Sequence, residues 1–297
     1  MYKKILVGFA GDEAGRDGAA LASRLAEILG AQLLVAFPYH PLISAVSAEN
    51  AERLVRSDLR ELLGETGAIA AAEYHWSNAS WPTRALHELA EFTGAQMIVL
   101  GGAPDHRQVG LMGRIVHGAP CAVAVAPAGY ALTPPHDLQR IGAGFSDSPE
   151  ARAAVALAET LASSAGAELR VIAGSALAPA LAGYAFSSPS LPLIEDQLYA
   201  ETKAAAETAA GEIVSREDVR LDVRRGDPSR VLVEASRSLD LLVLGSRAYG
   251  PLRHALLGGV SSVVMREAHC PVLVLPRSSL ESRSKEQSDV ASTVLDA

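Results

Sequence analysis

A glycine- and serine-rich stretch in the last quarter of the chain contains the residues best suited to chemistry. Residues 241–276 read LLVLGSRAYGPLRHALLGGVSSVVMREAHCPVLVLP, a pattern of strand, glycine loop, helix and strand. Backbone amides in a glycine-rich turn that leads into a helix N-terminus bind anions. The stretch therefore predicts a phosphate site with the candidate residues Gly245, Ser246, Arg247, Gly250, Gly258, Gly259, Val260, Ser261 and Ser262.

The same glycines also have a purely structural interpretation. Gly245 would then only end a strand, and Gly258 with Gly259 would only permit a tight helix start. The chain has no GxxxxGK[ST] motif, and no GxGxxG follows the first strand of either half. Spacing alone leaves both interpretations open.

Charged residues near the stretch have two interpretations as well. Arg225 and Arg247 suit phosphate oxygens, because a guanidinium matches their geometry, whereas Arg253 is expected to be solvated. Asp227 would contact a ribose hydroxyl or cap the helix that begins near Ser229, and we favour the cap.

Composition narrows the function classes. The net charge of -8 argues against bulk binding to nucleic acid or to anionic membranes. The chain contains no uninterrupted apolar run of about 18 residues, so we expect no transmembrane helix. Two cysteines, Cys121 and Cys270, are expected to be buried and unpaired, which favours the cytoplasm. The eight histidines lack metal-ligand spacing and no GxSxG occurs, so neither a metal site nor a catalytic nucleophile is predicted.

An internal repeat divides the chain. Arg140 stands 136 residues after Lys4, and the sequences that follow match in the same register as far as Leu33 and Leu169. Later, MIVLG matches LLVLG, and APCAVAVAP matches AHCPVLVLP. We therefore predict two domains, 1–128 and 138–277, joined by a linker and followed by a disordered tail, 278–297.

Strand and helix patterns alternate in each half. In the first half we expect strands at 5–9, 32–37, 70–75, 96–100 and 122–126, and helices at 14–29, 47–63, 82–92 and 109–117. Apolar runs without alternation are typical of parallel strands buried on both faces. The fold class is therefore doubly wound α/β, with ligands expected at the carboxyl ends of the strands. Loops 38–50 and 174–192 would be lids or interface loops.

The stretch around the glycines resembles the universal stress protein family. That family has the pattern Gly, two residues, Gly, nine residues, then Gly and Ser or Thr. Here Gly245 begins the pattern, Ala248 stands at the second glycine, and Gly258 is followed by Gly259 in place of Ser or Thr. RRGDPSRVLVEA and HCPVLVLP are also similar to the family, and the resemblance covers nearly all of both halves.

The resemblance implies five-stranded sheets of order 3-2-1-4-5 and, in some members, ATP binding. An acidic residue after the first strand helps to hold the nucleotide in those members. That position falls on Ala10 in the first half and Ser146 in the second, and Met112 stands where Ser261 stands in the other half. The resemblance thus implies ATP in the second domain only, with Ser146 at the nucleotide. It also implies pairing of the two halves through their last strands and a homodimer of chains.

A second resemblance is faint. Residues 144–148, GFSDS, share an Asp-Ser pair and one serine with the SGGxDS loop of ATP pyrophosphatases. We expect instead that Ser146 or Ser148 caps the helix that follows, with Pro149 in its first turn.

Three functions follow in order of preference. The first is a stress-response protein regulated by an adenine nucleotide, with little or no turnover. The second is a nucleotide-free scaffold that acts through protein contacts, and the third is an ATP-cleaving enzyme. Ser146 and Gly259 favour the scaffold, whereas the retained loop glycines and Ser261 favour the nucleotide.

Overall fold

A computed structural model gives the fold for residues 2–38, 47–64, 66–77, 82–102, 118–134, 137–177, 190–215, 218–246 and 259–276. Two compact units divide the chain, and among the described residues one holds 2–134 together with 273–276, while the other holds 137–246 together with 259–272. We describe each unit by itself. The finer ends of the predicted domains stay predictions, and the predicted tail lies outside the described residues.

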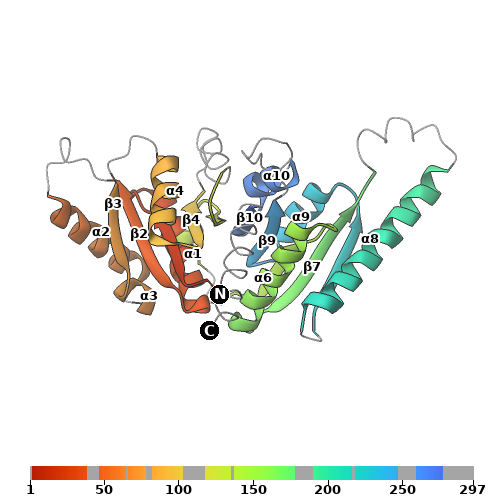
Figure 1. The fold of residues 1–297 in the computed structure, drawn as a ribbon, viewed down its shortest axis with the longest axis horizontal. Helices are drawn as coiled ribbons and strands as arrows, with labels where there is room; N and C mark the ends of the chain where they lie inside the picture. Colours follow the sequence, from red (N-terminus) through yellow and green to blue (C-terminus); the bar gives the residue numbers. More distant parts are fainter. Residues whose placement is uncertain are drawn as a thin grey trace, which may run out of the picture. The chain divides into compact units, whose positions relative to one another are not determined.

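The first unit is a parallel sheet with helices (Figure 1, red to yellow). Its described strands follow the order β3-β2-β1-β4-β5, and every pair is parallel. Its elements are β1 (Lys4–Gly8), α1 (Glu13–Leu29), β2 (Gln32–Pro38), α2 (Ala48–Leu63), α3 (Gly67–Ala70), β3 (Glu73–Ser77), α4 (Pro82–Thr93), β4 (Met97–Gly101), β5 (Ala122–Ala126) and the 3-10 turn η1 (Tyr130–Leu132).

The second half repeats this arrangement (Figure 1, green to blue). Its described strands follow the order β10-β9-β6-β7-β8, with parallel pairing of β6 to β7, β6 to β9 and β7 to β8. Its elements are β6 (Arg140–Gly144), α6 (Pro149–Ala165), β7 (Glu168–Ser175), α8 (Leu191–Ile213), β8 (Arg220–Arg225), α9 (Pro228–Ser236), β9 (Leu241–Ser246), α10 (Gly259–Glu267) and β10 (Val272–Pro276). The predicted doubly wound α/β class and strand order are confirmed.

Local sequence sets the ends of the repeated first helix in each unit. Asp12 caps α1 and Ser148 caps α6, each accepting a hydrogen bond from the amide three residues later. Gly30 and Gly166 end these helices in the left-handed conformation, with φ of 60° and 65°. Of the two predicted caps, Ser146 and Ser148, the structure has Ser148.

One predicted strand is misplaced. The expected strand at 70–75 lies at Glu73–Ser77, because the residues before it form the short helix α3. The Thr66 hydroxyl accepts a hydrogen bond from the Ile69 amide, and alanine-rich sequence favours a helical turn after such a cap. The predicted helix at 109–117 lies outside the described residues.

The core consists of small aliphatic side chains. Every residue of β5 and of β10 is buried, as expected for strands covered on both faces. Cys121 and Cys270 are buried and free, as predicted. No helix in the described part of the chain combines the length and apolarity needed to cross a membrane.

Candidate functional site

The candidate site lies at the carboxyl edge of the second sheet. Strands β9, β6 and β7 are parallel neighbours, so their carboxyl ends share one edge. Ser146 follows β6 and is exposed, whereas Ser175 and Ser246 end β7 and β9 and are buried. The edge therefore carries hydroxyl groups from three adjacent strands.

Gly245 has a structural reason to be glycine. A Cβ at this position would lie within 3.0 Å of the carbonyl carbon and oxygen of Glu150 and of the Ala151 amide nitrogen. All three atoms belong to the backbone of the first turn of α6. The close approach of α6 to β9 therefore requires glycine here, whether or not a ligand binds.

Helix α10 begins beside this edge. Gly259 and Val260 are exposed, and the side chain of Ser261 is buried. The Ser261 hydroxyl donates to the carbonyl oxygen of Gly245 at 3.4 Å. The first four amides of a helix have no partner inside it and carry its positive end. These amides suit an anion, while the Ser261 hydroxyl links α10 to β9.

Ser146 occupies the position where the resemblance to the universal stress protein family implies an acid in nucleotide-binding members. Its hydroxyl lies 3.5 Å from that of Ser148. Asp147 follows one residue after the position predicted for the acid, and its carboxylate forms an ion pair with Arg152 at 3.1 Å. The position after β6 thus offers a neutral hydroxyl.

Asp227 is a helix cap, as predicted. Its carboxylate accepts hydrogen bonds from the Ser229 and Arg230 amides at 3.0 and 3.2 Å. A further hydrogen bond from the Ser229 hydroxyl holds the pKa of the Asp227 carboxyl below its ordinary value.

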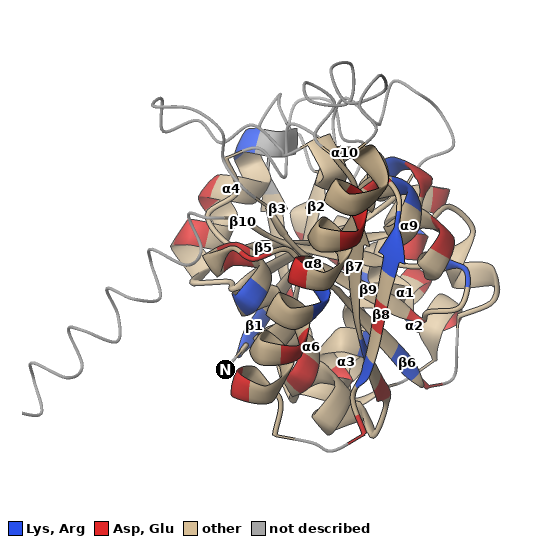
Figure 2. Ribbon diagram, turned by 90° about the vertical axis from the view of Figure 1, so that its right-hand side faces the viewer, with Lys and Arg blue, Asp and Glu red and all other residues tan. Residues whose placement is uncertain are grey.

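Arginines of β8 are engaged by carboxylates rather than open to an anion (Figure 2, blue on β8). Arg225 pairs with Asp196 at 2.6 Å and lies over the Tyr199 ring at 5.0 Å. Arg224 pairs with Asp222 at 2.5 Å. The interpretation of Arg225 as a phosphate ligand thus has no support in its contacts.

The predicted site residues fall into two groups. Five of them lie together around the end of β9 and the start of α10: Gly245, Ser246, Gly259, Val260 and Ser261. Ser262 follows on α10, and Ser146 lies after the adjacent strand β6. Arg247, Gly250 and Gly258 lie outside the described residues, as do Ala248, Arg253 and Met112. Sequence reasoning missed Ser175, whose only signal is its place directly after an apolar strand run.

The first unit repeats one element of this geometry. A Cβ at Gly101, which ends β4, would collide with the backbone of Ala14 on α1. Ala10 is exposed after β1, where Ser146 stands in the second half. Among the described residues of both units, no group of three histidine, cysteine or acidic side chains gathers as metal ligands would.

Comparison with known proteins places the chain in a family. Residues 138–276 match the universal stress protein family model. A universal stress protein of Thermus aquaticus is 32% identical over 133 residues, which are 44% of this chain and 93% of that protein. Universal stress protein Rv2005c of Mycobacterium tuberculosis is 33% identical over 197 residues, or 62% of this chain and 63% of that protein.

Other comparisons cover different shares of the relatives. Universal stress protein Rv2624c of Mycobacterium tuberculosis is 33% identical over 97 residues, 33% of this chain and 34% of that protein. The chain thus spans about a third of the length of this relative.

Two crystal structures share the fold. Protein PA1789 of Pseudomonas aeruginosa has a TM-score of 0.66 at 19% identity, covering 97% of each chain. A universal stress protein of Archaeoglobus fulgidus has a TM-score of 0.59 at 16% identity, covering 92% of this chain and 98% of that one. On the sequence matches, this chain belongs to the universal stress protein family.

Proposed function

We propose that the protein is a stress-response protein regulated by an adenine nucleotide, ATP or a close relative, at the carboxyl edge of the second sheet. The observation that carries this proposal is the start of α10 beside the end of β9. There, exposed Gly259 and Val260 begin a helix whose first amides have no partner within the helix itself and suit a phosphate. Ser146 and Ser246 would supply hydroxyls to the ribose or the phosphates.

The same proposal includes binding with little or no turnover. Ser146 provides no carboxylate to act as a base or to hold a magnesium ion. Asp147, the nearest acid in sequence, is paired with Arg152. We further propose a cytoplasmic location. Pairing of the halves through the two last strands, and of whole chains as a homodimer, stays a prediction.

A second candidate function is a nucleotide-free scaffold that acts through protein contacts. The observation in its favour is the hydrogen bond between Ser261 and Gly245, which uses a hydroxyl that would otherwise face phosphate. Gly259 in the place of Ser or Thr removes a second hydroxyl.

Extraction of small molecules from the purified chain, followed by calorimetric titration with ATP, separates the two functions. Ser146→Asp restores the acid found in the binding members at an exposed position. A hydrogen bond to a charged group should strengthen ATP binding about tenfold. Ala10→Asp is the matched control, because it makes the same change at the equivalent place in the first unit, where we expect no nucleotide.

The outcomes differ sharply. Stronger ATP binding by Ser146→Asp with no change in Ala10→Asp supports the nucleotide proposal. The absence of any carried nucleotide, together with no heat from the parent chain or Ser146→Asp at millimolar ATP, would refute it and leave the scaffold. An equal gain in both variants would show non-specific effects of charge and refute the proposed location.

A further inference from the structure

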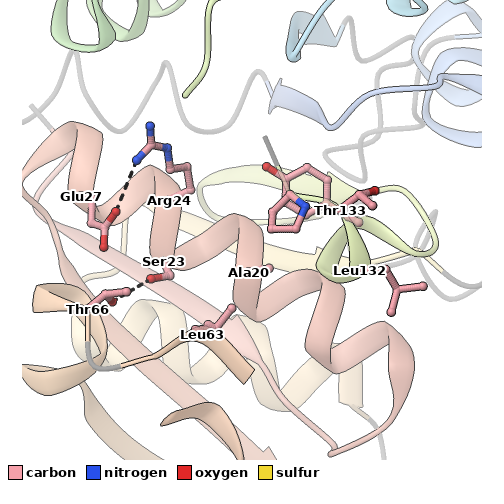
Figure 3. A pocket seen from close by; sticks show the side chains of 10 residues that line it. Ala20, Ser23, Arg24, Glu27, Leu63, Thr66, Leu132 and Thr133 are labelled. Carbon is pink, nitrogen blue, oxygen red and sulfur yellow. Dashed lines mark hydrogen bonds and ion pairs between the residues drawn. The ribbon is translucent and has the colours of Figure 1, made fainter. Parts of the chain in front are cut away.

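A cavity of about 390 Å³ opens in the first unit (Figure 3). One wall is a stripe along α1 at positions i, i+3, i+4 and i+7. The lining includes Ser23, Arg24, Glu27, Leu63, Thr66 and Pro134. A helix that connects parallel strands runs antiparallel to them, so this C-terminal half of α1 lies at the amino end of the sheet. The cavity is therefore remote from the carboxyl edge of its own unit.

The walls are fixed by hydrogen bonds. The buried Asp17 carboxylate accepts from the amides of Gly129 and Ala131, both at 2.7 Å, and so holds η1 against α1. On the other side, the hydroxyls of Ser23 and Thr66 lie 3.2 Å apart (Figure 3). A cavity whose walls are tied in this way needs little reordering to accept a ligand.

The lining combines both charges with an apolar surface. Arg24 and Glu27 form an ion pair at 3.5 Å on the α1 wall. Leu63 and Pro134 add apolar surface. A ligand anion alone would meet Glu27, and a ligand cation alone would meet Arg24. A small zwitterion with an apolar side chain satisfies all three features.

The fold itself does not require this charge pair. The equivalent positions on α6, 136 residues later, are Thr160 for Arg24 and Ser163 for Glu27. The pair therefore belongs to the first unit alone, as does Asp17, whose equivalent is Ala153.

We propose that the first unit binds a free apolar α-amino acid in this cavity. The carboxylate of the ligand lies on Arg24 and its ammonium on Glu27. Its side chain packs against Leu63 and Pro134, while the Ser23 and Thr66 hydroxyls line the floor. This site is separate from the proposed nucleotide edge and does not depend on it.

Calorimetric titration of the full chain with L-leucine tests the proposal. The comparison ligands are 4-methylpentanoate, which lacks the ammonium, and 3-methylbutylamine, which lacks the carboxylate. Each should bind at least about tenfold more weakly than L-leucine, because each loses a charge-assisted hydrogen bond. Arg24→Gln should weaken L-leucine binding by a similar factor, whereas Arg16→Gln should not. Arg16 is the matched control, because it lies on the same helix, pairs with Asp58 at 3.2 Å and is outside the cavity.

Glu27→Gln provides a second variant outside the core, since Glu27 is exposed. It should also weaken L-leucine binding, because the ligand ammonium loses its charged partner, with an unchanged urea midpoint. The proposal is overturned if neither L-leucine nor L-isoleucine, L-valine, L-methionine or L-phenylalanine binds up to about 10 mM. It is equally overturned if the single-charge analogues bind as tightly as L-leucine, or if Arg24→Gln and Glu27→Gln leave binding unchanged.

Discussion

Replacement of Gly245 by alanine should destabilise the second unit without any involvement of a ligand. The added Cβ would meet the Glu150 carbonyl and lie 2.7 Å from the Ala151 amide nitrogen. Backbone atoms cannot rotate away as a side chain can, so the first turn of α6 or the end of β9 must shift. Overpacking of this kind costs about 1–3 kcal/mol.

Urea denaturation followed by circular dichroism measures this effect. With a slope of about 2 kcal/mol per molar urea, a loss of about 2 kcal/mol lowers the midpoint by about 1 M. The matched control is Gly259→Ala, because a Cβ at position 259 meets none of the described residues within 4 Å. Alanine is the better helix former there, so the control should leave the midpoint unchanged or raise it slightly.

Tryptophan fluorescence assigns the effect to a unit. The chain has two tryptophans, Trp76 and Trp81, and both belong to the first half. Gly245→Ala should therefore lower the midpoint seen by circular dichroism more than the one seen by fluorescence. Gly101→Ala, which makes the same collision with Ala14, should lower the fluorescence midpoint. If Gly245→Ala and Gly259→Ala unfold at the same urea concentration, the packing explanation for Gly245 is wrong.

Three further predictions concern buried polar and titratable groups. Asp17→Asn should lower the free energy of unfolding in urea by about 2 kcal/mol, because an amide replaces a charged acceptor of two backbone hydrogen bonds. The control Asp58→Asn, on the surface, should cost less than about 1 kcal/mol. Burial raises the pKa of Cys121 and of Cys270 to about 12. Both thiols should therefore resist iodoacetamide at pH 8 until urea unfolds the chain, and rapid labelling of the folded protein would contradict this. The free energy of unfolding should fall between about pH 9 and pH 12, because only the thiols of the unfolded chain ionise in that range. Tyr74→Phe should keep or raise the urea midpoint, because the buried Tyr74 hydroxyl has no hydrogen-bond partner among the described residues, and a loss above about 1 kcal/mol would show a missed partner.

Sequence patterns predicted the helices and strands well, because residues close together in the sequence determine where these elements begin and end. The apolar runs placed the strands, and the caps at Ser148 and Asp227 could be inferred from residues three or fewer positions away. The contacts that shape the two sites could not be inferred in this way. Asp17 binds an amide 112 residues further along the chain, and Ser261 binds a carbonyl 16 residues before it. Neither pair leaves a periodic pattern, because each depends on how a helix packs against a distant segment. The short helix α3 was missed because Thr66 starts a single turn before a run that also fits a strand.

The glycines of the family pattern do not all carry the same information about a ligand. Gly101 is the last residue of the fourth strand of its unit, and Gly245 is the last but one of β9. Both lie where the first helix packs against the strand, and both would collide with backbone if they gained a Cβ. The first unit keeps this glycine although its sequence argues against nucleotide binding. Packing alone is therefore sufficient to retain the first glycine of the pattern. Gly259 differs, because a Cβ there would meet no atom of the described part of the chain within 4 Å, and a serine would fit against that part. An inference about the ligand from sequence should therefore depend on Gly259 and Ser146, where the fold imposes no such requirement.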